Sequence, residues 1–141
     1  INRKTSGSLT HFLIGPVTIL ALRRAIVDDG RHIRLLVNHV LFTVPNLDTA
    51  ELEALSGPDV YFELCDFSCS PMTNATTPAK VASYLSALPN ARWVMASDSG
   101  QRDNAHSPEA LMRYYTALTR EGVSQELLER MLKTHPAELM A

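Results

Sequence analysis

The sequence predicts an α/β protein made of parallel strand–helix units of the TIM-barrel type. Apolar stretches alternate with amphipathic ones four times along the chain, at spacings of roughly 25 to 33 residues. Parallel neighbouring strands require a crossover connection, which is usually a helix. The apolar stretches are also nearly continuous, as in strands covered on both faces. We therefore expect about four units, equivalent to half of an eight-fold barrel, with about four helices on the outer side.

The first unit is expected to start with a strand over 8–14 (SLTHFLI). Pro16 then opens an amphipathic stretch that stops at Gly30, because proline favours the first turn of a helix and glycine its end. The second strand is predicted over 32–39 (HIRLLVNH).

The next helix is predicted over 48–56, where Asp48 is a good N-cap. A third strand over 59–65 (DVYFELC) follows Gly-Pro, and Thr77 with the proline after it starts the third helix. The second and third units therefore repeat the order of the first.

The fourth unit combines a strand over 92–97 with a helix over 107–122, and two shorter helices over 124–133 and 136–140 close the chain. Apolar spacings of three and four residues indicate which side chains the helices bury. These are Leu20, Leu22, Ile26, Leu52, Leu55, Leu111, Tyr115 and Leu118.

Length and composition limit the classes of protein. At 141 residues and 45% apolar content, the chain is expected to form one domain over 1–141. A net charge of −2, with Lys and Arg scattered along the chain, argues against nucleic acid or an acidic membrane surface as partner. The apolar runs are shorter than the roughly 20 residues of a membrane span, so we expect a soluble, cytoplasmic protein. Each of HFLIGP and ASDSGQ holds a single glycine, which disfavours dinucleotide and P-loop binding.

Polar side chains occur within or directly after the predicted strands. His11 lies in the first, His39 ends the second, Glu63 and Cys65 end the third, and Asp98 follows the fourth. Because the carboxyl ends of parallel strands share one face, these groups are expected to converge. Imidazole and carboxylate suit Zn²⁺, Mn²⁺ or Fe²⁺, and such an ion lowers the pKa of bound water from about 15.7 to about 7. Asp98 would then orient that water or take its proton.

Each candidate also has a purely structural interpretation. Asp98 before Ser-Gly is typical of a turn or an N-cap, and a histidine at a strand end is often hydrogen-bonded core. Glu63, between two apolar residues, is predicted to contact substrate or to form an ion pair with an Arg or Lys. Gln101 and Asn104, in the loop after the fourth strand, are candidate substrate contacts or merely solvated.

Cys65 and Cys69 have no second cysteine pair with which to complete a zinc site. We therefore interpret them as two reduced thiols beside a loop.

The stretches LLVNHVLFTVPNLDTAELEAL, VYFELCDFSCSPM, WVMASDSGQ and THPAELM resemble the C-terminal half of metal-dependent hydrolases of the amidohydrolase superfamily, over about residues 32–141. The resemblance implies a TIM barrel in which a histidine after strand six and an aspartate after strand eight belong to the metal and catalytic site. These roles fall on His39 and Asp98, and the strand-five histidine of the family falls near His11.

The chain also departs from that family. It has no His-x-His pair, which the family carries on its first strand, and it has His135-Pro136 where the family's terminal helix usually begins Asn-Pro. Four units leave two sheet edges and an apolar interior exposed. We therefore expect a homo-oligomer, or a second chain that supplies the other barrel half, with well above about 1,000 Å² of surface buried.

Two classes of function follow from these patterns. In the first, a divalent metal activates water to hydrolyse a C–N or C–O bond of a small-molecule substrate, with His39 as ligand and Asp98 as ligand or base. In the second, the chain is a non-catalytic half-barrel scaffold or partner subunit. Specificity in this architecture depends on variable loops, so the pattern leaves the substrate open.

Overall fold

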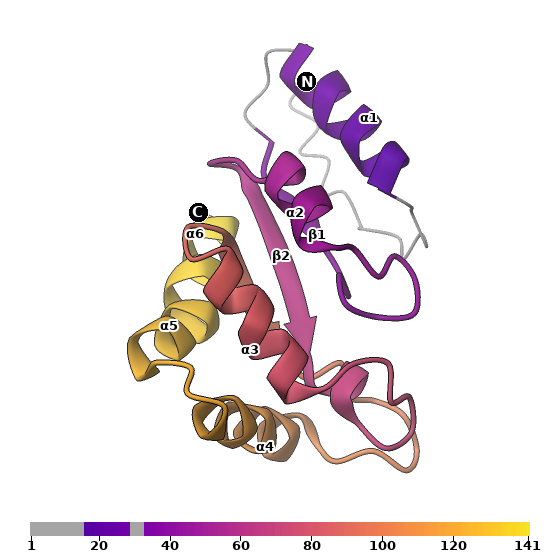
Figure 1. The fold of residues 1–141 in the computed structure, drawn as a ribbon, viewed down its shortest axis with the longest axis vertical. Helices are drawn as coiled ribbons and strands as arrows, with labels where there is room; N and C mark the ends of the chain where they lie inside the picture. The colour runs from indigo at the N-terminus through magenta and orange to yellow at the C-terminus, as the bar shows by residue number, and fades with distance from the viewer. Residues whose placement is uncertain (1–15, 29–32) are drawn as a thin grey trace, which may run out of the picture.

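The computed structural model describes residues 16–28 and 33–141, which form a sheet flanked by helices (Figure 1). Within these residues the sheet has three strands, all parallel, in the order β1-β2-β3. The predicted α/β class with parallel strands is confirmed for this part of the chain, and the strand expected over 8–14 lies outside it. The strands are β1 (Leu35–Val37), β2 (Val60–Cys65) and β3 (Arg92–Ala96).

The register of the sheet aligns the carboxyl ends of β2 and β3, and β1 ends three residues earlier, opposite Phe62. Val37 of β1 lies opposite Phe62, and Cys65 at the end of β2 lies opposite Ala96 at the end of β3. Residues that follow β1 and β3 therefore reach the same edge of the sheet as Cys65.

The helices largely follow the predicted order. They are α1 (Pro16–Asp28), α2 (Thr49–Leu55), α3 (Pro78–Ala87), α4 (Ser107–Arg120), α5 (Gln125–Glu129) and α6 (His135–Met140), with a 3₁₀ turn η1 (Asp66–Cys69) and a π turn η2 (Arg130–Thr134). The two closing helices were predicted as separate, but the π turn joins α5 to α6 without a break. Pro136 has no N–H to donate, and the π turn widens the helix just before it.

Helices α2 and α3 start at the predicted caps. The Asp48 carboxylate accepts a hydrogen bond from the backbone of Glu51 at 2.8 Å, and the Glu51 carboxylate accepts one from Asp48 at 2.9 Å. Thr77 Oγ1 accepts the Lys80 N–H at 3.2 Å. These side chains satisfy N–H groups that the first turn of a helix leaves without partners.

The core lies between the sheet and the helices, and it confirms only some predicted buried positions. Leu52 and Leu55 are buried as expected. In contrast, Leu22 of α1 is 42% exposed, so that prediction is wrong, because α1 buries Ile19 instead. Leu20 is partly buried, and the side chain of Ile26 lies outside the described part.

The buried face of helix α4 differs from the predicted one by one residue at two of its three positions. It buries Ala110, Tyr114 and Leu118, while Leu111 and Tyr115 are only partly buried. The predicted positions are four and three residues apart and the observed ones four apart, so both fit the helical period. Leu118 belongs to both sets and is buried as expected. Helix α4 packs against α3 and η1.

A polar cluster fixes the C-terminal helix to the amino-terminal half of the sheet. His135 is 2% exposed, and its Nδ1 donates to the backbone oxygen of Trp93 at 2.7 Å. Arg92 pairs with Glu138 and lies 5.4 Å from the centre of the Tyr61 ring. His135 is therefore a buried, structural residue.

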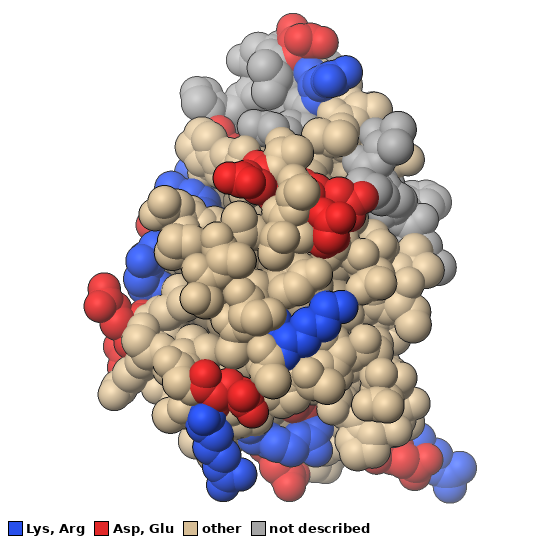
Figure 2. Space-filling view, in the orientation of Figure 1, with Lys and Arg blue, Asp and Glu red and all other residues tan. Residues whose placement is uncertain are grey.

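The surface carries charges of both signs. On the face shown in Figure 2, acidic and basic side chains are interspersed and separated by uncharged surface. No helix in the described parts of the chain has the length and apolar character needed to cross a membrane.

Candidate metal site at the carboxyl ends of the strands

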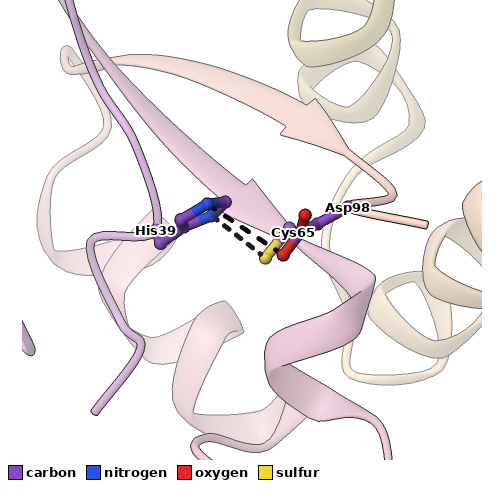
Figure 3. A group of neighbouring side chains, drawn as sticks. All are labelled: His39, Cys65 and Asp98. Carbon is purple, nitrogen blue, oxygen red and sulfur yellow. Dashed lines mark hydrogen bonds and ion pairs between the residues drawn. The ribbon is translucent and has the colours of Figure 1, made fainter. Parts of the chain in front are cut away.

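Three side chains from the ends of successive strands meet at the carboxyl edge of the sheet (Figure 3). His39 follows β1, Cys65 ends β2 and Asp98 follows β3. One ligand atom of each lies within 4.8 Å of the other two. An imidazole nitrogen, a sulfur and a carboxylate oxygen are donors that zinc accepts. This group could therefore hold a metal ion.

His39 is positioned by the neighbouring strand. β1 ends at Val37, and His39 adopts a left-handed backbone conformation with φ 54°. Its N–H donates to Glu63 Oε2 at 3.0 Å, and its ring Nδ1 lies 2.9 Å from the same oxygen. Glu63 therefore holds both the backbone and the ring of His39. In the described structure this carboxylate pairs with a histidine rather than with an Arg or Lys.

The environment of His39 strongly favours positive charge. Hydrogen bonds to Cys65 and to Glu63 raise the pKa of His39 to about 10, although burial of the ring acts in the opposite direction. At neutral pH the ring is therefore an imidazolium. The groups that stabilise this cation would also stabilise a metal cation.

Cys65 is the site residue that the sequence did not single out as a ligand. Its side chain is buried, with Sγ 3.6 Å from His39 Nδ1 and 2.9 Å from Ser68 Oγ. The signal that could have identified Cys65 is its position in the strand. Cys65 lies two residues after Glu63, so both side chains point to the same face of β2, and it is the last residue of that strand.

Asp98 completes the group from the loop after β3. Its Oδ2 lies 4.0 Å from His39 Nε2, and its side chain is 30% exposed, so it can meet a molecule from solvent. Asp98 also has a positive φ, at 48°. Two left-handed, non-glycine residues therefore lie in one site, and strained backbone of this kind concentrates at functional sites.

The other predicted site residues do not belong to the group of three donors or lie outside the described residues. Gln101 and Asn104 bond to each other, with Asn104 Nδ2 donating to Gln101 Oε1 at 2.9 Å. That bond stabilises their own loop, and their contact with substrate stays a prediction. His11 lies outside the described residues.

A thiol beside an imidazole also occurs in cysteine hydrolases, but the geometry favours a ligand over a nucleophile. In those enzymes the carboxylate binds the imidazole nitrogen opposite the thiol. Here Cys65 Sγ and Glu63 Oε2 both approach Nδ1, while Asp98 lies beyond hydrogen-bond distance of Nε2. Cys65 is also only 1% exposed, which restricts attack on a substrate.

Comparison of the chain with family models, with curated proteins and with solved structures gives no match in any of the three.

Proposed function

We propose that this chain contributes the metal site of a hydrolase of the amidohydrolase type. The observation that carries the proposal is the meeting of His39 and Asp98 at the carboxyl ends of β1 and β3, with Nε2 and Oδ2 4.0 Å apart. These are the two positions that the sequence resemblance assigns to the metal and catalytic site. The parallel order of the strands supports the same assignment, because loops at this edge build the sites of α/β enzymes.

His39 would bind the metal through Nε2. Glu63 lies 2.9 Å from Nδ1, where a carboxylate accepts the Nδ1–H, so a metal at Nε2 would displace the second proton of the ring. The bond from the His39 N–H to the same carboxylate fixes the position of the ring. Glu63 is thus a positioning residue in this proposal, and its contact with substrate stays a prediction.

Asp98 would act as a ligand or as the base. A divalent ion held at this position would lower the pKa of a coordinated water to near neutrality and would polarise a carbonyl group. Asp98 takes the proton from the attacking water as the water oxygen bonds to the carbonyl carbon. It then returns that proton to the nitrogen or oxygen that leaves when the C–N or C–O bond breaks. Its partial exposure lets a small-molecule substrate reach it.

The proposal is tested by metal analysis together with Asp98→Asn. We expect stoichiometric Zn²⁺, Mn²⁺ or Fe²⁺, and hydrolysis of a member of a panel of small amides, lactones and esters. Asp98→Asn should lower that activity by about 10²–10⁴-fold, the usual contribution of a general acid–base group. A metal-free protein whose activity is unchanged by Asp98→Asn would contradict the hydrolase and favour the non-catalytic scaffold.

A further inference from the structure

The thiol of Cys65 lies inside the candidate site, although the sequence resemblance assigns it no role. Cys65 is 1% exposed and has Sγ 3.6 Å from His39 Nδ1. It belongs to the group of three donors that lie within 4.8 Å of one another. In a tetrahedral zinc site, where zinc–ligand bonds are about 2.0–2.3 Å long, neighbouring ligand atoms lie about 3.3–3.8 Å apart. The three donor atoms would therefore have to move closer together to bind one zinc ion.

Ser68 is placed to support a thiolate at this position. Its Oγ lies 2.9 Å from Cys65 Sγ, and the residue is buried. The backbone oxygen of Ser68 accepts N–H bonds from Ala75 and Thr76, each at 3.0 Å, so the turn that carries the hydroxyl is held in place. A hydroxyl that donates to sulfur stabilises the charged form, and the charged form is the one that binds metal.

The start of the same turn is fixed to α4. Asp66 is buried, and both of its carboxylate oxygens accept hydrogen bonds from the Arg113 guanidinium. A bidentate pair of this kind constrains both orientation and distance. The turn that presents Ser68 to Cys65 is therefore anchored at both ends.

We propose that Cys65 is a third metal ligand, beside His39 and Asp98, and that its sulfur makes the site selective for thiophilic ions such as Zn²⁺ and Co²⁺ over Mn²⁺. This inference rests on the metal site of the proposed function and specifies the metal class. Thiolate is a soft ligand that suits zinc, whereas manganese prefers carboxylate, carbonyl and water. Three protein ligands with one open position are also the usual arrangement of a catalytic zinc.

The test is Co²⁺ titration of the metal-free protein, read by absorption spectroscopy. We expect a near-ultraviolet thiolate-to-cobalt charge-transfer band in the wild type and in Cys69→Ser, and its loss in Cys65→Ser. Cys69 is the matched control, because it is the other cysteine and lies outside the group of three donors. Competition with a chelator should show that Cys65→Ser weakens Zn²⁺ binding by at least about 100-fold, while Mn²⁺ binding changes little.

The possible results separate this inference from the proposed function. Wild-type protein that binds Co²⁺ with visible ligand-field bands but no charge-transfer band overturns the role of Cys65 and leaves the metal site intact. Protein that binds none of Co²⁺, Zn²⁺ and Mn²⁺ overturns both. Wild type and Cys69→Ser suffice for this decision, so the inference stays testable even if Cys65→Ser does not fold.

Discussion

The two ends of the sheet each hold a histidine in a polar cluster, and the clusters differ in how the ring is used. At the amino-terminal half, His135 donates from Nδ1 to the Trp93 carbonyl, and its Nε2 lies 3.3 Å from the Arg130 guanidinium, which can only donate. Both ring nitrogens are therefore occupied. At the carboxyl ends, His39 has Glu63 at Nδ1, and its Nε2 faces Asp98 at 4.0 Å.

The difference shows what separates a structural polar cluster from a candidate site. In the His135 cluster the polar groups bind one another, since Arg92 is paired with Glu138 and stacked on Tyr61. The His39 group instead directs nitrogen, sulfur and oxygen donors from three strands toward one another. Its His39 and Asp98 also lie in left-handed backbone, at a cost of order 1–3 kcal/mol each, as Asn46 and Asn74 do elsewhere in the described chain.

The largest expected effect is that of removing either ring. His39→Ala should weaken Zn²⁺ binding by more than about 100-fold, because it deletes a ligand rather than an outer-shell partner. His135→Ala should lower the free energy of unfolding by about 1–3 kcal/mol, through its lost buried hydrogen bonds, and leave the Zn²⁺ affinity unchanged. Calorimetric titration and urea unfolding measure the two quantities. An equal loss of Zn²⁺ affinity in both variants would contradict the assignment of metal binding to the His39 group alone.

The second effect concerns the carboxylates that accompany each histidine. Glu63→Gln keeps an acceptor near His39 but loses the charge, so Zn²⁺ affinity should fall by about 10–100-fold. The matched control is Glu138→Gln, which removes a half-exposed carboxylate from Arg92 at the other end of the sheet. It should leave Zn²⁺ affinity unchanged and cost about 0–1 kcal/mol of stability. A Glu63→Gln protein with wild-type affinity would show that this carboxylate does not position the ring.

Sequence patterns predicted the three described strands and most helices because both depend on local signals. The second predicted strand, 32–39, is shorter in the structure, where β1 is Leu35–Val37. Continuous apolar runs marked β2 and β3, and the Asp48 and Thr77 caps marked the starts of α2 and α3. His39 and Asp98 were selected because the ends of parallel strands share an edge, which needs no knowledge of packing.

What the sequence could not predict depends on contacts between distant segments. Cys65 acquires a possible role as a metal ligand only because His39, 26 positions away in the sequence, turns back toward it. The face that α4 buries depends on its packing against α3 and η1, since Tyr114 and Tyr115 fit the same periodicity. The exposure of Leu22 likewise depends on how α1 is oriented.

The third effect is a pH dependence that arises at the His39 end of the sheet. Because the folded pKa of His39 is raised from 6.5 to about 10, the folded state keeps a proton that the unfolded chain loses above pH 6.5. The resulting stabilisation is complete below pH 6.5 and is lost as pH rises toward 10, at a cost of order 1 kcal/mol or more. Urea unfolding of the chelator-treated protein across this range measures it. The His39→Gln variant cannot bind this proton, so its free energy of unfolding should change less with pH. If it changes as steeply as in the wild type, the pH dependence arises from another group.

The smallest effect tests whether the backbone at Asp98 is strained. Asp98→Ala and Asp98→Gly both delete the carboxylate and its interactions, but alanine retains the left-handed cost of φ 48° while glycine does not. The glycine variant should therefore be more stable than the alanine variant by about 0.5–1 kcal/mol in urea unfolding. Met112, exposed and inside α4, should show the opposite order, since alanine favours a helix by about 1 kcal/mol over glycine. If alanine proves at least as stable as glycine at position 98, then Asp98 is not strained.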